Sequence, residues 1–323
     1  MVSDLALMGA RGSQLRLAAR VARAYHEQGM RQAEIAEAFH ISQPRVSRLL
    51  KAAVAAGIVR TTVTVPPEVN IELTETLEQA YGIKRALVVD AEGEITPALG
   101  AAAASYLSNT LLGTDTMGIS SWSASVIATA YALSPFRTKV VDNVVQLVGG
   151  MGNPQVQMQA TQLIGQLASY TGADPILLPT PGILGSVEAR DALVSDPVVA
   201  DVAQTWSRLT IALIGIGGIE PSDLASQSGN VFPTDDLAAL EAAGAVGDVC
   251  FRFINRDGEL VRSSFDDRVI AIDPDVLRAV PRRVGIAGGS RKVEAIRGAM
   301  LGGWINILVT DRTTAEHLVK LAT

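Results

Sequence analysis

Apolar side chains recur every three or four positions in three stretches near the start of the chain, which is the spacing of amphipathic helices. The first stretch covers residues 14–28, with Leu15, Ala18, Ala22 and Tyr25 expected on its inward face. The second covers residues 32–39. The third begins after Ser42, a residue type that caps helices well, tolerates Pro44 in its first turn and ends near Gly57. The pattern therefore predicts three short helices, each with one face turned inward.

The connection between the second and third predicted helices is His40-Ile41-Ser42, the short turn that a helix-turn-helix requires. His40 stands where the backbone of such a turn is left-handed, a conformation in which glycine or asparagine is more usual. The solvent side of the third helix carries polar and basic residues, namely Gln43, Arg45, Ser47, Arg48 and Lys51. We expect this helix to enter the major groove of DNA.

The polar residues of this head divide into two expected roles. Gln43 and Arg45, together with Ser47, can contact base edges. The residues better suited to phosphates are Arg31, Arg48 and Lys51. The alternative is a basic three-helix bundle that serves as an oligomerisation arm, with the same arginines as solvated surface.

Charge is unevenly distributed along the chain. Between Arg11 and Arg60 there are nine basic and three acidic residues, so this segment carries a formal charge of +6 while the remainder carries −12, for an overall −6. A basic head on an acidic body is the asymmetry expected when only the head meets phosphate. The charge pattern therefore favours operator DNA as the partner of the head.

The chain changes character after the third predicted helix. Residues 58–65 alternate in a strand-like way and are expected to form a wing beside the helices. Pro66-Pro67 then breaks regular structure and marks a linker. We therefore expect a helical, winged helix-turn-helix domain over residues 1–60, a linker over 61–70 and a larger domain over 71–323.

The larger domain alternates short β-branched runs with amphipathic stretches rich in alanine and leucine. The predicted strands are residues 86–89, 116–120, 144–148, 175–178, 210–216, 269–272, 283–287 and 305–310. This βαβ alternation predicts a Rossmann-like α/β domain with a mostly parallel sheet covered by helices. A turn at Asn255-Arg256-Asp257-Gly258 suggests a hairpin within residues 246–260, so one strand pair is expected to be antiparallel.

Three strand-to-helix junctions carry candidate binding residues, because parallel sheets bind ligands where strands end and helices begin. Residues 118–125 contain four serines, for which an ordinary serine-rich helix cap is the alternative. Residues 146–153 combine glycines with glutamines that follow, for which a flexible turn is the alternative. Residues 285–292 end in Lys292, which can neutralise a phosphate, although a solvated lysine in a first helical turn is the alternative.

Composition excludes several classes of protein. With 48% hydrophobic and 19% charged residues, the 323-residue chain is expected to fold around a sizeable core. Cys250 is the single cysteine, which excludes a disulfide framework and a cysteine-based zinc cluster. The chain carries no long uncharged apolar run and no signal-peptide pattern, so we expect a cytoplasmic protein without a membrane partner, metal or cofactor.

Together these segments resemble the SorC family of bacterial sugar-responsive transcriptional regulators, from about Leu15 onward. The matching segments are residues 32–36 and 42–50 in the head and residues 118–123, 244–248, 287–292 and 308–311 in the body. The resemblance implies a body similar to sugar-phosphate isomerases and glucosamine-phosphate deaminases, without their activity. It also implies an effector that is usually a phosphorylated sugar, and tetramers that bind palindromic operators.

The resemblance also assigns roles to individual residues. Those implied to line the phosphate or polyol end of the effector are Ser120, Ser121 and Ser123, and those implied to face the sugar are Gly149, Gly150 and Gln159. Asp248 is implied to accept hydrogen bonds from hydroxyls, and Lys292 to bind the phosphate. Many members carry a Trp-Gly-x-Thr loop that Ser-Ser-Trp-Ser-Ala-Ser replaces here, so a sugar phosphate and a polyol are both expected effectors.

Two functions remain open on the sequence. The favoured one is a ligand-gated DNA-binding regulator of a carbohydrate or polyol catabolic operon. The alternative is a sugar-phosphate isomerase or deaminase with a DNA-binding head, which needs a general acid and base close together. The body has one histidine, His317, and no clear paired carboxylates at strand ends; Lys292 could form a Schiff base, but a phosphate contact is simpler.

Overall fold

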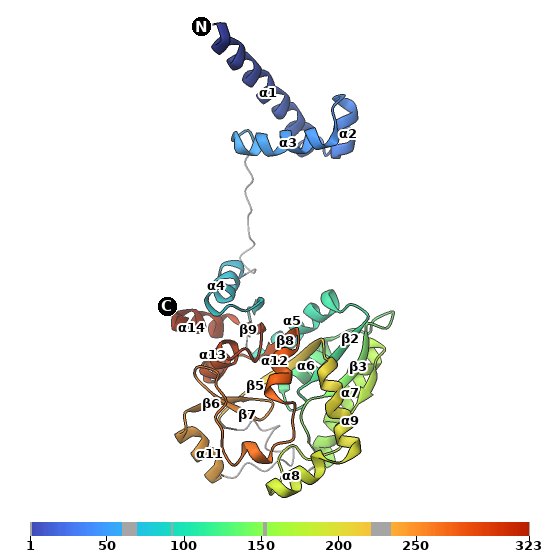
Figure 1. Cartoon of the computed structure of the whole chain (residues 1–323), viewed down its shortest axis with the longest axis vertical. Coiled ribbons are helices and arrows are strands. Elements are labelled where there is room, and N and C mark those ends of the chain that lie inside the picture. The colour runs from blue at the N-terminus through green and yellow to red at the C-terminus, as the bar shows by residue number, and fades with distance from the viewer. Residues whose placement is uncertain (1, 60–69, 92, 151–153, 221–233, 323) are drawn as a thin grey trace. The chain divides into compact units, whose positions relative to one another are not determined.

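The computed structural model describes residues 2–59, 70–91, 93–150, 154–220 and 234–322, and the chain divides into units 1–66 and 67–323 (Figure 1). Side chains are described from residue 14 in the first helix and from residue 158 in the helix after residue 153. The expected wing at 58–65 and the expected linker at 61–70 fall almost entirely outside these ranges. The two units are therefore taken one at a time.

The first unit consists of α1 (Val2–His26), α2 (Gln32–Ala38) and α3 (Gln43–Ala55). Its core joins residues that all three helices contribute: Ala18, Val21, Ala22, Ala24, Ile35, Val46, Leu49 and Ala53. The expected inward positions Leu15 and Tyr25 are instead 46% and 39% exposed. The expectation was wrong there because α1 turns a stripe of small residues inward, and small residues let helices approach closely.

The turn between α2 and α3 confirms the predicted geometry. His40 has a φ of 52°, which is the left-handed conformation, and the amide of Ile41 donates to the carbonyl of Ala36 at 2.9 Å. Ser42 occupies the N-cap position of α3, where its carbonyl accepts from the amides of Arg45 and Val46. At the start of α2, the Glu34 carboxylate accepts from the backbone amide of Arg31 at 2.7 Å. The turn and both helix starts are thus fixed by local hydrogen bonds.

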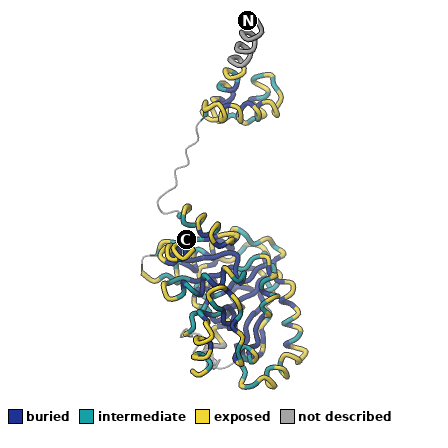
Figure 2. Tube along the Cα trace, turned by 60° about the vertical axis from the view of Figure 1, so that its left-hand side comes forward, coloured by how far each residue is buried: buried dark blue, intermediate teal, exposed yellow. Residues whose placement is uncertain are grey.

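The second unit is a helix-covered sheet (Figures 1 and 2). Its described α-helices are α4 (Ile71–Tyr81), α5 (Ile95–Thr110), α6 (Ala124–Ala132), α7 (Pro154–Thr171), α8 (Val187–Val194), α9 (Pro197–Thr205), α11 (Thr234–Ala242), α12 (Pro274–Ala279), α13 (Val293–Leu301) and α14 (Arg312–Ala322). Short 3-10 turns are η1 (Trp206–Arg208), η2 (Asp266–Arg268) and η3 (Ser290–Lys292). None of the described helices is both long enough and apolar enough to cross a membrane.

The strands confirm the predicted mostly parallel sheet. They are β1 (Arg85–Val89), β2 (Asp115–Ile119), β3 (Val141–Gln146), β4 (Asp174–Ile176), β5 (Ile211–Gly218), β6 (Ala245–Val249), β7 (Arg252–Asn255), β8 (Arg282–Ile286) and β9 (Ile307–Asp311). Seven of them pair in parallel in the order β1-β9-β8-β5-β2-β3-β4, and β6 and β7 add an antiparallel hairpin to the end of β5.

Both faces of this sheet are buried, which is why its strands are apolar without a polar alternation. In β5, Ile211 and Leu213 pack on one face among side chains of α5, α6 and α7. Ala212 and Ile214 pack on the other face with side chains of α9, α13 and α14. In Figure 2 the buried strands run through the middle of the unit and the exposed residues lie on the surrounding helices.

Two details of the predicted strands differ from the structure. Residues 269–272 form no strand and make only isolated bridges, Ile183 to Val269 and Val148 to Ala271. The antiparallel hairpin exists, but its turn lies at Cys250 and Phe251, which have φ values of 53° and 62°. The Asn255–Gly258 turn also reverses the chain, as expected, but the pairing across it is a single antiparallel bridge between Ile254 and Leu260.

The edge strand β1 is closed by the helix that precedes it. The Glu78 carboxylate accepts from the backbone amide of Ala86 at 2.9 Å, and the Asn70 side-chain amide donates to the carbonyl of Val88 at 3.5 Å. These contacts satisfy backbone groups that an edge strand otherwise leaves unpaired. The start of α4 is therefore tied to the sheet and not only to its own helix.

A tryptophan locks the loops after β2 and β3 together. Trp122 is 7% exposed and its indole N–H donates to the carbonyl of Gly149 at 3.0 Å. Its ring lies so close to Gly150 that a Cβ there would fall 1.8 Å from the ring carbon Cζ2. Only glycine fits at position 150, and the reason is packing within the protein.

We expect Gly150→Ala to lower the free energy of unfolding by about 1–3 kcal/mol, the range typical of overpacking a filled core. Gly165→Ala in α7 is the matched control, because no atom lies within 4 Å of the added methyl and helical alanine is favoured over glycine by about 0.5–1 kcal/mol. Chemical denaturation measures both. Equal stability of the two variants would contradict the packing account.

Candidate effector site and nucleic-acid interface

The candidate site lies where the strand order changes direction. From β2 the chain proceeds outward through β3 and β4, whereas β5 returns to the other side of β2 and leads to β8 and β9. The helices that come next after β2 and β5 among the described elements, α6 and α11, contribute to the cores on opposite faces of the sheet. Open α/β sheets bind ligands at such a switch point.

The serine loop after β2 reaches this switch point. Ser123 accepts from the amide of Val126 at 3.4 Å as the cap of α6, and its Oγ lies 2.4 Å from where a Cβ would stand on Gly215 of β5. Ser120 is buried, and its amide donates to the carbonyl of Leu213 at 2.9 Å. Both serines are thus fixed against the end of β5.

Ser121 differs from its neighbours because its hydroxyl has no partner. The residue is 1% exposed and its Oγ makes no hydrogen bond within the described part of the chain. A buried hydroxyl without a partner costs roughly 1–3 kcal/mol, so such groups usually mark a strained, functional or solvent-filled position. Because Ser123 already caps α6, Ser121 is not needed for capping.

Asp248 comes to the same place from the hairpin. It lies on β6 opposite Gly217 of β5, and its Oδ2 accepts from the amide of Phe251 at 2.9 Å. Burial raises the pKa of Asp248 to about 6, against the opposing effects of that hydrogen bond and of the positive charge of Lys292. The carboxyl group can therefore be protonated or ionised near neutral pH.

Lys292 approaches from the junction after β8. Its Nζ donates to the carbonyl of Ile216 at 2.9 Å, so the ammonium lies over the end of β5. Burial lowers the pKa of Lys292, while Asp248 raises it and Arg291 lowers it further. The lysine and the aspartate influence each other without forming a direct ion pair among the described contacts.

One residue of this cluster was missed on the sequence, where Cys250 counted only as the single cysteine. A side-chain hydrogen bond joins Cys250 to Ser120, and burial, followed by the charge of Asp248, raises the pKa of the thiol to about 12. The signal that could have found it was the position of the hairpin turn. With the turn at 250–251, Cys250 directly follows β6 and stands two residues after Asp248.

The glycines after β3, which were expected to face the sugar, make hydrogen bonds within the protein. The amides of Gly149 and Gly150 already donate to the carbonyls of Ile270 and Thr180, at 3.0 and 2.8 Å. Gln159 is exposed on α7, and no described contact joins it to the serine loop. The structure thus brings Ser120, Ser121, Ser123, Asp248 and Lys292 together, attaches Gly149 and Gly150 through Trp122, and leaves Gln159 apart.

The candidate nucleic-acid interface is the outer side of α3. Gln43, Arg45, Arg48 and Lys51 are exposed, Ser47 is half-buried, and Val46 and Leu49 pack into the core on the opposite side. Arg48 extends along the helix, with its Nε 3.4 Å from the carbonyl of Pro44. Arg31 is exposed at the start of α2. The predicted readers therefore share one polar face next to a left-handed turn.

Comparison with known proteins bears on the whole chain. Residues 65–320 match the model of a family described as "Putative sugar-binding domain", and residues 13–66 match a model of the MarR family. The sorbitol operon regulator of Klebsiella pneumoniae is 30% identical over 312 residues, which are 95% of this chain and 98% of the relative. The chain belongs to the SorC family of sugar-binding transcriptional regulators.

Other members agree in sequence and in fold. The deoxyribonucleoside regulator of Bacillus subtilis is 33% identical to this SorC-family protein over 309 residues, 94% of this chain and 97% of the relative. The crystal structure of the full-length Klebsiella sorbitol regulator superimposes with a TM-score of 0.74, covering 95% of this chain and 99% of that one. These relatives are transcriptional regulators, which is what the resemblance of the motifs implied.

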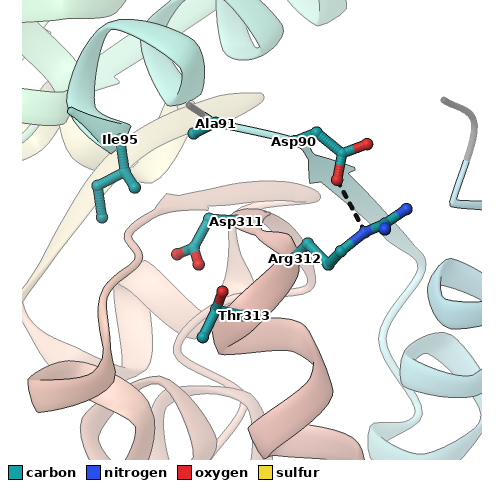
Figure 3. Close-up of a pocket in the computed structure, with 6 residues that line it drawn as sticks. All are labelled: Asp90, Ala91, Ile95, Asp311, Arg312 and Thr313. Atoms are coloured by element: carbon teal, nitrogen blue, oxygen red, sulfur yellow. Dashed lines mark ion pairs between the residues drawn. The ribbon is translucent and has the colours of Figure 1, made fainter. Parts of the chain in front are cut away.

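Two hollows lie outside the cluster at the switch point. One, of about 340 Å³, is at the carboxyl ends of β1 and β9 (Figure 3). The other, of about 650 Å³, is lined by residues of α8, β7 and α12 and holds four arginines among six acidic residues. Three of those arginines are already paired, as in Arg252–Asp266 at 2.5 Å. Neither hollow contains the serines.

The raised pKa of Asp248 has a direct consequence for stability. Because the folded-state pKa of about 6 exceeds the ordinary value of 3.8, the native state holds its proton longer than the unfolded state does. The contribution of Asp248 to the free energy of unfolding therefore falls as pH rises from about 4 to about 6. We expect Asp248→Asn to gain up to about 3 kcal/mol on the parent across this window.

Asp311→Asn is the control for this experiment, because hydrogen bonds lower the pKa of Asp311 below its ordinary value despite its burial. The carboxylate of the parent protein stabilises the fold increasingly as pH rises. The free energy of unfolding of Asp311→Asn should therefore fall relative to that of the parent as pH rises through the acidic range. Denaturation curves at pH 4, 5, 6 and 7 measure both slopes. A constant difference between Asp248→Asn and the parent would contradict the assignment.

Proposed function

We propose that this SorC-family protein is a DNA-binding regulator of a carbohydrate or polyol catabolic operon. In this proposal a sugar phosphate or polyol binds at the switch point of the larger unit and shifts the population of operator-competent forms. The protein acts as a homo-oligomer, most simply a tetramer on a palindromic operator. The names of the relatives, a sorbitol operon regulator and a deoxyribonucleoside regulator, support the carbohydrate class.

One observation carries the effector site. Five predicted polar residues from three separate segments meet at the switch point, and one of them, Ser121, has a buried hydroxyl that finds no hydrogen-bond partner among the described residues. Serine hydroxyls and a carboxylate suit the hydroxyls of a polyol. Lys292 and the start of α6 suit a phosphate, since a lysine supplies a point charge and a helix N-terminus favours negative charge.

Operator binding is tested by a mobility-shift assay with the DNA upstream of the protein's own gene. We expect a specific complex that weakens with salt. Arg45→Ala should lower the discrimination between this DNA and a scrambled competitor by about 1–3 kcal/mol if the guanidinium is bidentate to a guanine. Arg23→Ala on α1, where the arginine pairs with Glu27, is the matched control and should keep discrimination. Absence of any specific complex would refute the proposal.

Effector binding is tested by thermal shift with sorbitol, sorbitol 6-phosphate, ribose 5-phosphate and inorganic phosphate. A compound that binds the native state stabilises it by about 2.7 kcal/mol at a hundredfold excess over its Kd. Lys292→Ala should lose most of the shift given by a phosphorylated compound and keep that of a polyol. Arg291→Ala is the control, because the neighbouring arginine is exposed and should leave both shifts intact. An unchanged response in Lys292→Ala would remove this residue from the site.

One observation favours the enzyme alternative, namely a carboxyl group with a pKa of about 6 close to a lysine. A group poised near neutral pH is what general acid or base catalysis requires. His317 does not join it, since this histidine is exposed on α14. Steady conversion of a pentose or hexose phosphate by the pure protein would favour an isomerase or deaminase, whereas binding without turnover favours the regulator.

A further inference from the structure

Two consecutive residues at the end of β9 hold two segments that are far apart in sequence. Asp311 reaches the effector junction: its Oδ2 accepts from the amide of Gly289 at 2.9 Å and from the Thr314 hydroxyl at 2.6 Å. Its Oδ1 accepts from the amide of Thr314 at 3.0 Å. A Cβ on Gly288 would lie 2.3 Å from Asp311 Oδ2, so the junction is in tight contact with this carboxylate.

Arg312 holds the other segment. Its Nε lies 2.7 Å from Asp90 Oδ1 and 3.0 Å from the side-chain oxygen of Asn70, and a second guanidinium nitrogen also donates to that oxygen. Asn70 in turn donates to Asp90 at 3.4 Å and stands at the N-cap position of α4. It is the first described residue after 60–69, the residues that connect to the helix-turn-helix along the chain.

We propose that Asp311 and Arg312 are a relay through which a ligand on the Gly288–Lys292 junction alters the anchor of the segment leading to the DNA-binding unit. The proposal rests on the effector site proposed above. It assigns no ligand contact to either residue. Asp311 positions the junction, and Arg312 positions Asn70.

The contacts of Asp311 are more buried than those of Arg312, so the two halves of the relay differ in how easily they can rearrange. Asp311 is 5% exposed and all of its described bonds are to buried or half-buried groups, so Gly289 cannot shift without moving it. Arg312 and Asp90 are about half exposed, and ion pairs as exposed as this one contribute little to stability. A contact this weak can exchange between two arrangements when its neighbour moves.

Figure 3 shows space for such a change. The hollow of about 340 Å³ is lined by Asp90, Ala91, Ile95, Asp311, Arg312 and Thr313, with the guanidinium of Arg312 directed to Asp90. Ile95 also borders the effector junction, since a Cβ on Gly289 would lie 3.4 Å from its Cδ1. The two relay residues and Asp90 thus line one space, and Ile95 connects this space to the junction. The carboxylates that line it are already bonded, which argues against a separate ligand there.

The relay is tested first without any ligand, by amide hydrogen exchange of the full chain. Arg312→Ala and Asn70→Ala should speed exchange about threefold to fivefold in peptides covering residues 70–76, because they remove a contact of up to about 1 kcal/mol. They should also speed exchange in peptides covering residues 284–292. Asp311→Asn removes a contact of residues 284–292 and should speed exchange there. It should also speed exchange in residues 70–76, because coupling is reciprocal.

Lys139→Ala is the matched control, since Lys139 and Asp142 form a pair of similar exposure elsewhere on the unit. It should change neither peptide. Faster exchange confined to residues 70–76 in both Arg312→Ala and Asn70→Ala would overturn the relay, as would no change at all. Using two variants from opposite sides of the contact keeps the result decisive if one of them folds poorly.

The second arm uses sorbitol 6-phosphate and the upstream DNA fragment. Arg312→Ala should bind sorbitol 6-phosphate with a Kd within about twofold of the parent, yet lose at least half of the logarithmic change that this compound causes in operator affinity. A full response in Arg312→Ala would overturn the relay. If the parent itself shows no response to any compound of the panel, the proposed effector class fails, and the exchange experiment alone decides the relay.

Discussion

Parallel pairing between β2 and β5 is the constraint on which the site depends. The register sets Met117 beside Ile211 and Ile119 beside Leu213, so β2 ends there while β5 continues to Gly218. The serine loop that follows β2 therefore lies against the end of β5, and the strand order alone accounts for this placement. The antiparallel hairpin attaches to the last residues of β5 and brings Asp248 and Cys250 to the same end of the sheet.

The helical and strand elements were predictable because their signals are local. Helical spacing, the three-residue turn and the βαβ alternation depend only on neighbours in sequence, and the structure confirms them. The errors arose where long-range contacts decide. Residues 269–272 have strand composition but meet only single residues of two loops, and Leu15 and Tyr25 have the right spacing but lie beside the buried stripe of α1.

The same distinction applies to the site. Ser120, Ser121, Ser123 and Lys292 could be predicted to meet because they follow strand ends, which converge in a parallel sheet. Asp248 was implied only by the resemblance to the SorC family, since it lies on an antiparallel strand. Gly150 was taken for a place where a ligand approaches, whereas the Trp122 ring occupies that space. Cys250 was passed over because the turn with two positive φ values contains neither glycine nor asparagine, the residues by which such turns are recognised.

Charge explains why the cluster can respond to a ligand. Asp248 and Lys292 are both held away from full solvation, and burial acts against the charged form of each. Neither neutralises the other by direct contact, since Lys292 bonds to the carbonyl of Ile216 and Asp248 to the amide of Phe251. A ligand that supplies hydroxyls to the carboxylate, or an anion to the ammonium, would stabilise charges that burial within the protein disfavours. Such a ligand would interact directly with the Gly288–Lys292 junction, which is hydrogen-bonded to the carboxylate of Asp311.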